Sequence, residues 1–371
     1  MKTTLRSIAF VVMLLLVCDI ASALPRFSAR TGAKCQACHV NPSGGGIRQT
    51  FGVQYGRDEL PVPTWSEEYN LDEFSTQITD FISVGADFRT LFFYQQLPDT
   101  GTLGKTSSNA FWQMQGDVYL NFRIAKKVNI YLDKGIYSGY EIFGLLNILP
   151  ANGFIKVGKF TPNFGMRMDD HTAFVREYTG FSAERGRPEI TGAEVGVSPG
   201  PFTISGGIFN AADVLGAGAS NQKAFLGRAE GMFKATEEIN VGIGANMFTK
   251  KSASGVRTTL FGGFGAFSYQ NFTLLGEVDM MQSKFLGATT DGIVVYVEAN
   301  YVVTPGLDLK AAYDFYDPNT DIKTGSLSRY SVGLEFFPIS GVEVRPMYRI
   351  IKEDPTDVKN DEFHLLIHFY L

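Results

Sequence analysis

Residues 112–124 read "WQMQGDVYLNFRI", and apolar and polar side chains alternate along this stretch. Successive side chains of a β-strand point to opposite faces, so a period of two predicts a strand with one apolar and one polar face. The apolar set is Trp112, Met114, Gly116, Val118, Leu120, Phe122 and Ile124. The stretch therefore predicts an amphipathic β-strand.

The same alternation recurs in residues 307–315, 329–336 and 342–345. Segments of about ten such residues, separated by turns, are typical of a transmembrane β-barrel. A soluble β-sandwich has the same period, so the alternation alone leaves both folds open.

The lengths of the connections separate these two folds. About sixteen candidate strands start near residues 81, 110, 127, 141, 153, 189, 201, 223, 238, 256, 272, 291, 307, 327, 342 and 361. Short connections lie at 126–127, 150–153, 198–201, 235–238, 270–271, 304–306 and 338–341, and they alternate with longer ones at 97–109, 161–188, 211–222, 283–290, 317–326 and 352–360. Outer-membrane barrels have this asymmetry, with tight periplasmic turns and long outer loops. We expect an all-β fold, an antiparallel transmembrane barrel of about 16 strands over residues 81–371.

The last segment of the chain supports the barrel. It carries an apolar face of Phe363, Leu365, Ile367, Phe369 and Leu371. We expect the opposite face, with His364, Leu366, His368 and Tyr370, to point into the lumen.

The first residues are typical of a secretory signal. Lys2 and Arg6 precede an apolar run over residues 8–17, and residues 21–23 form a small-x-small cleavage site. We expect a signal peptide over 1–23 and a mature protein in the Gram-negative outer membrane, in contact with its lipid. The net charge of −5 argues against a nucleic-acid partner.

Residues 35–39 read "CQACH". A Cys-x-x-Cys-His spacing is the attachment signal for c-type haem, with two thiols for the porphyrin and an imidazole for the iron. A redox disulfide and half of a zinc site are the alternatives, but no thioredoxin-like pattern and no second cysteine pair accompany Cys35 and Cys38. We expect one covalent haem c, bound by Cys35, Cys38 and His39, with His39 as the proximal iron ligand.

The haem segment is short. It occupies residues 24–60 and precedes a linker over 61–80. A segment of under about 40 residues rarely folds alone. We expect a loop-rich or helical plug whose missing walls are supplied by the barrel.

The order of these parts resembles the fused monohaem cytochrome–porins of the outer-membrane iron oxidases. That family has a Phe-Ala-Arg-x-Thr-Gly stretch before the haem motif, and here Phe27, Ala29, Arg30, Thr31 and Gly32 are similar, with Ser28 inserted. The family's Pro-rich stretch and Phe-Gly-Arg after the histidine are matched only by Pro42 and by residues 51–53. The resemblance implies electron transfer through the outer membrane.

The longest loop, residues 161–188, contains residues that can serve as a second, distal iron ligand, and the last strand contains two more. His171 is the favoured distal candidate, and Met166, Met168, His364 and His368 are rivals. By analogy with porins, this third outer loop folds into the lumen. An ordinary charged constriction and a five-coordinate iron are the alternatives.

Two functions follow. The first is electron transfer across the outer membrane between a periplasmic cytochrome or other soluble carrier and an extracellular donor or acceptor, with iron oxidation or metal reduction as the enzymatic form. The second is a diffusion porin whose haem segment is a plug or redox sensor.

Overall fold

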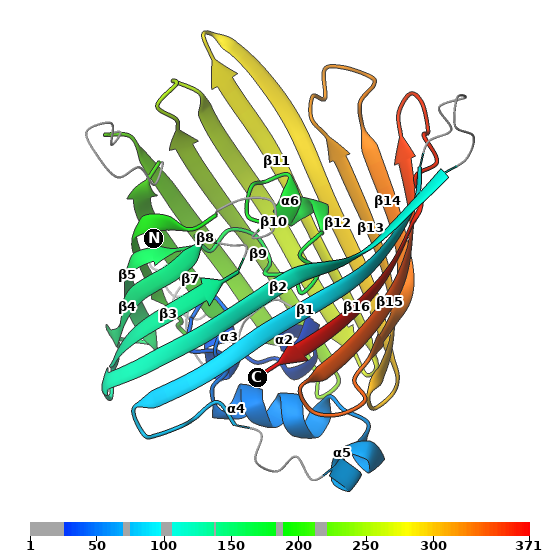
Figure 1. The fold of residues 1–371 in the computed structure, drawn as a ribbon. Coiled ribbons are helices and arrows are strands. Elements are labelled where there is room, and N and C mark those ends of the chain that lie inside the picture. The colour runs from blue at the N-terminus through cyan, green and yellow to red at the C-terminus, as the bar shows by residue number, and fades with distance from the viewer. Residues whose placement is uncertain (1–25, 70–74, 98–105, 137–138, 183–187, 212–220) are drawn as a thin grey trace, which may run out of the picture.

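The computed structural model describes residues 26–69, 75–97, 106–136, 139–182, 188–211 and 221–371. The predicted signal peptide lies outside these residues. The described residues form a closed antiparallel barrel in which β1 pairs with both β2 and β16 (Figure 1). The fold is therefore the predicted all-β transmembrane barrel with sixteen strands.

The strands are β1 (Ile82–Leu97), β2 (Thr106–Ala125), β3 (Val128–Gly135), β4 (Tyr140–Leu149), β5 (Gly153–Phe160), β6 (Ile190–Val197), β7 (Phe202–Asn210), β8 (Lys223–Lys234), β9 (Ile239–Lys251), β10 (Arg257–Tyr269), β11 (Phe272–Phe285), β12 (Ala288–Thr304), β13 (Leu307–Asp317), β14 (Leu327–Phe336), β15 (Val342–Glu353) and β16 (Glu362–Tyr370). The helices are α2 (Arg26–Thr31), α3 (Cys35–Cys38), α4 (Thr50–Gln54), the π-helix η1 (Tyr55–Glu59), α5 (Pro63–Tyr69) and α6 (Phe174–Glu177). No helix among the described residues is long and apolar enough to span a membrane.

The alternating side chains separate as the sequence predicts. Val118, Val332 and Phe369 are exposed on the outer surface, where a barrel meets lipid. Asn121 and His368, from the opposite faces of their strands, are buried in the interior. The apolar band is thus the surface that contacts the membrane.

Strict alternation over residues 112–124 is wrong at one position. Arg89 of β1 pairs with Gln115, but the next residue of β1 pairs with Gln113, so Met114 has no partner on β1. This bulge reverses the two faces of β2 beyond it, because one extra residue shifts the side-chain phase. Phe111, which precedes the bulge in β2, is strongly exposed and packs on Phe92 with ring centroids 5.2 Å apart.

A second expectation also fails. Residues 283–290 were expected to form a long outer loop, but β11 and β12 continue almost to their ends and pair through Phe285 and Ala288. Leu286 and Gly287, with φ of 49° and 88°, form a two-residue turn. Two positive φ values suit the twist of a tight hairpin, so the strands need no longer connection.

The N-terminal helices lie inside and below the barrel (Figure 1). Figure 1 shows α2 and α3 within its lower half and α6 higher in the lumen, while α4 and α5 lie at the lower rim. Lys34 fixes this plug to the β6–β7 turn, because its Nζ donates to Ser198 O at 3.2 Å and Gly200 O at 2.9 Å. The segment expected to be a linker contains the helix α5.

Candidate functional site

The Cys-x-x-Cys-His motif lies on the plug, inside the barrel. Cys35 and Cys38 are the two ends of α3 and, three residues apart, share one face of it. Both are free thiols, and burial raises the pKa of Cys35 to about 12. The motif is therefore presented as a pair of protonated thiols beside His39.

A glycine turn closes the plug behind the motif. Gly45 and Gly46 have φ of 75° and 65°, which side chains rarely adopt. A methyl group on Gly46 would also lie 1.7 Å from the hydroxyl oxygen of Tyr131 on β3. Glycine is required here because the turn is pressed against the barrel wall.

His39 is oriented by this turn. Its Nδ1 lies 3.3 Å from the carbonyl oxygen of Gly46, so an Nδ1–H donates there and Nε2 is left to accept. Burial and Arg48 lower the pKa of His39 to about 4, so its ring is neutral. A neutral imidazole whose second nitrogen donates to a carbonyl is the usual arrangement of a metal-binding histidine.

A cavity of about 330 Å³ opens in front of the motif. Cys35, Cys38 and His39 line it from the plug, and Met168 and His171 line it from the third outer loop. Its volume falls in the range of small-molecule and cofactor sites, about 300–1,000 Å³. The plug and the loop, which come from opposite rims of the barrel, therefore meet at one cavity.

The cavity also carries a guanidinium group with one nitrogen that makes no hydrogen bond to the described residues. Nη1 of Arg48 is buried and has no hydrogen-bond partner among the described residues, and Nη2 lies 3.7 Å from Asp87 Oδ1. A guanidinium with an open position suits a carboxylate, and haem carries two propionates. Two thiols, an oriented imidazole and an open guanidinium fit a c-type haem.

The candidates for the distal iron ligand have different surroundings in the structure. His171 reaches the cavity, but its Nε2 accepts a hydrogen bond from Arg89 Nη1 at 2.7 Å. Met166 and Met168 pack in the same apolar cluster, and of the two Met168 also lines the cavity. Both ring nitrogens of His368 lie 2.9 Å from carboxylates, and His364 Nε2 lies 3.1 Å from Glu362.

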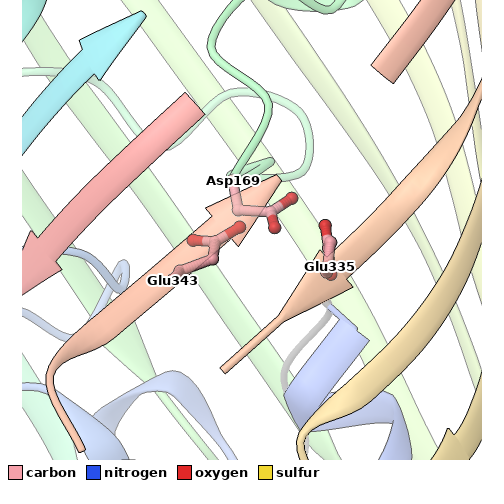
Figure 2. A group of neighbouring side chains, drawn as sticks. All are labelled: Asp169, Glu335 and Glu343. Atoms are coloured by element: carbon pink, nitrogen blue, oxygen red, sulfur yellow. The ribbon is translucent and has the colours of Figure 1, made fainter. Parts of the chain in front are cut away.

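An ion-pair network, which the sequence did not predict, joins the loop to the plug. Figure 2 shows Asp169, Glu335 and Glu343 with their carboxylates turned toward one another, all within 4.8 Å. Three cationic side chains neutralise them: Arg26 bonds Glu335, and Lys310 and Arg345 lie 3.0 and 3.2 Å from it. We interpret this group as an ion-pair network, since its charges are matched within the protein.

Asp169 links this network to the outer loop. Its carboxylate lies 3.4 Å from Arg26 on α2, 3.4 Å from Lys310 and 3.3 Å from Arg345. Burial opposes its ionisation, but the surrounding cations hold the pKa of Asp169 well below its usual value. Alternation could mark these strand residues as inward-facing, but it could not reveal which loop residue they meet.

Solved structures of outer-membrane proteins are similar to this fold. OmpT of Vibrio cholerae is 14% identical with a TM-score of 0.56, over 80% of this chain and 100% of that chain. The anion-selective porin from Comamonas acidovorans is 9% identical with a TM-score of 0.57, over 78% and 99%. The outer-membrane channel DcaP of Acinetobacter baumannii is 12% identical with a TM-score of 0.55, over 78% and 97%.

No protein-family model and no curated protein matches the chain. At these identities the likeness shows the fold alone. The chain has the fold of an outer-membrane porin barrel, and its apolar outer band fits that location.

Proposed function

We propose that this porin-type barrel transfers electrons across the outer membrane through one covalent haem c held in its lumen. The observation that carries the proposal is the meeting of Cys35, Cys38 and His39 with the third outer loop at a single interior cavity. Only one partner from each side of the membrane then has to approach this centre.

The residues of the plug have separate parts in this function. The Cys35 and Cys38 thiols would add across two vinyl groups, each forming an S–C bond and giving its hydrogen to the other vinyl carbon. His39 would bind the iron through Nε2, because Gly46 O holds Nδ1. The haem would supply one-electron redox chemistry.

The charged groups of the cavity complete the site. Arg48 would hold a propionate with its open Nη1. His171 and Met168 are the candidates for the distal side, because both line the cavity. His171 would first have to exchange its bond to Arg89 for one to iron.

The proposed partners follow from distance. The apolar band of such a barrel is about 25 Å tall, so one haem cannot span it alone. A periplasmic cytochrome or other soluble carrier would meet the plug, and an extracellular donor or acceptor, with soluble iron as the first to test, would enter past the loop.

A diffusion porin is the second candidate, and the fold comparisons favour it. Two of the similar structures are an anion-selective porin and an outer-membrane channel. Against free diffusion stands the lumen itself, where Asp169 on the loop pairs with Arg26 on the plug.

Proteoliposomes distinguish the two functions. Ferricyanide is trapped inside, a reductant is added outside, and both ferricyanide reduction and leakage are followed for the wild type and for Cys35→Ala with Cys38→Ala. Electron transfer predicts fast reduction without leakage in the wild type alone. Equal reduction in both proteins, or rapid leakage from both, supports the diffusion porin.

A further inference from the structure

A second acidic group faces the interior from β9–β11, away from the haem motif. Glu277 and Asp279 lie two residues apart on the inner face of β11, and Asn246 points inward from β9. Gly262 of β10 lies between them, paired with Asn246 on one side and Asp279 on the other. All three polar side chains are buried, with Asp279 at 0% exposure and Asn246 at 6%.

The side chains of Asp279 and Asn246 converge above this glycine. A methyl group placed on Gly262 would lie 2.3 Å from Asp279 Oδ1 and 2.8 Å from both Oδ1 and Nδ2 of Asn246. The missing side chain of Gly262 therefore leaves a small polar cradle between two neighbouring strands.

The polar atoms of this cradle are not satisfied by the protein. Both carboxylate oxygens of Asp279 and both amide atoms of Asn246 have no hydrogen-bond donor or acceptor among the described residues. Glu277 and Asp279, two residues apart on one face of β11, place two carboxyl groups side by side, and one shared proton would neutralise them. Two adjacent buried carboxylates require either such a proton or a bound cation, because like charges in a low dielectric repel strongly.

Arg228 and Arg176 act on the Glu277 carboxyl group through their charge, and both also donate hydrogen bonds to other groups. Arg228 donates to Gly165 O and Glu230, both at 2.6 Å. Arg176 donates to the carbonyl oxygens of Phe164 and Phe181 at 2.9 and 2.8 Å. Asp169, by contrast, has three cationic side chains within 3.4 Å, those of Arg26, Lys310 and Arg345.

We propose that Asp279, Glu277 and Asn246 bind a divalent cation of the calcium class. Two carboxylates and an amide oxygen are the ligands that Ca²⁺ uses, at about 2.3–2.6 Å. Asn246 contributes through Oδ1, and Glu277 contributes the oxygen that does not accept the N–H of Met166. None of these three ligands lines the cavity beside Cys35, Cys38 and His39, so the proposal does not depend on haem binding.

A cation bound at Glu277 would also hold the start of the third outer loop in place. Met166 N donates to Glu277 Oε2 at 2.9 Å, and a methyl group on Gly165 would lie 2.3 Å from Glu277 Oε1. Fixing the Glu277 carboxylate therefore fixes the start of the loop that lines the cavity. Bound cation should protect this loop from protease.

Calorimetric titration of the full-length protein tests the site. Protein purified from outer membranes is freed of divalent ions with EDTA, exchanged into detergent at pH 8 and titrated with CaCl₂. We expect one saturable site in the wild type, weakened at least tenfold in Asp279→Asn. Gly262→Ala, which fills the cradle but keeps every ligand, should weaken it comparably.

The matched control is Asp308→Asn, which removes a buried lumenal carboxylate already paired with Arg30 at 2.7 Å and should leave the Ca²⁺ site intact. Heat-modifiable migration on gels confirms that each variant is folded. No saturable Ca²⁺ binding in the wild type would show that a shared proton neutralises the pair and would overturn the proposal. Equal loss in Asp308→Asn, or unchanged binding in folded Asp279→Asn, would overturn it as well.

Discussion

At the scale of single residues, the site depends on which atoms are already engaged. Gly46 O holds Nδ1 of His39, so Nε2 is the nitrogen left for a metal. Arg48 keeps one buried nitrogen without a partner among the described residues. His39 and Arg48 therefore each offer one nitrogen to the same cavity.

Replacing both thiols tests their role. We predict that Cys35→Ala with Cys38→Ala abolishes covalent haem and leaves a folded barrel, because the sixteen strands close on each other. The pyridine haemochrome assay measures attachment, and heat-modifiable migration measures folding. Loss of the folded band would show instead that plug and barrel fold as one unit.

Arg48 should tune the centre through its charge. A positive charge beside a haem favours the reduced iron, so Arg48→Gln should lower the midpoint potential by some tens of millivolts, and Arg48→Lys should retain most of it. The control is Arg123→Gln at the exposed rim. A redox titration in which all three proteins agree would remove Arg48 from the site.

The sequence was most informative about residues that act as a local unit. The grouping of Cys35, Cys38 and His39 could be predicted because they are neighbours in the sequence, and all three line one cavity; their role as haem ligands stays a prediction. The bond from Arg89 to His171 could not, since it joins β1 to a loop 82 positions away. No sequence pattern indicates that Arg48 Nη1 lacks a hydrogen-bond partner, because this depends on how the side chains pack.

At the scale of elements, the strands followed their pattern and the connections did so less closely. Alternation predicted most strand starts within a few residues, but it could not show the bulge at Met114, where no residue type marks the extra position. The supposed loop at 283–290 was polar enough to look like a connection, yet strand pairing continued through it. Hydrogen bonding between neighbouring strands decides where a strand ends and a connection begins.

The outer loop is held to the plug by Asp169. Asp169→Asn removes the charge that faces Arg26, Lys310 and Arg345, and should lower the free energy of unfolding by about 1–3 kcal/mol, since charged hydrogen bonds contribute about that much. Urea unfolding in detergent measures the change. Asp321→Asn in an exposed loop is the control. Equal stability of the two variants would mean that the network does not hold the loop.

At the scale of the whole molecule, the barrel is a wall around a plug and an inserted loop. Because α2 and the third outer loop pair with one another inside the lumen, through Arg26 and Asp169, we expect free passage to be obstructed. The composition and alternation predicted the barrel wall, and the short N-terminal segment led us to expect a plug inside it. The meeting point of plug and loop required the three-dimensional structure.

Conductance reports on this obstruction. The wild type should conduct poorly in a planar bilayer, and Gly46→Ala should conduct more, because its added methyl collides with Tyr131 and displaces the plug. Gly227→Ala, whose methyl meets nothing within 4 Å, should match the wild type. Large, equal conductance in all three would show that the lumen is open.

The central claim is that a c-type haem is covalently bound within a folded outer-membrane barrel. Pyridine haemochrome spectroscopy of the purified, heat-modifiable protein tests it most directly. The account predicts one haem per chain, with the spectrum of a porphyrin joined through two thioethers, lost when Cys35 and Cys38 are replaced. A folded barrel that carries no covalent haem, although a known c-type cytochrome matures normally in the same cells, would contradict it.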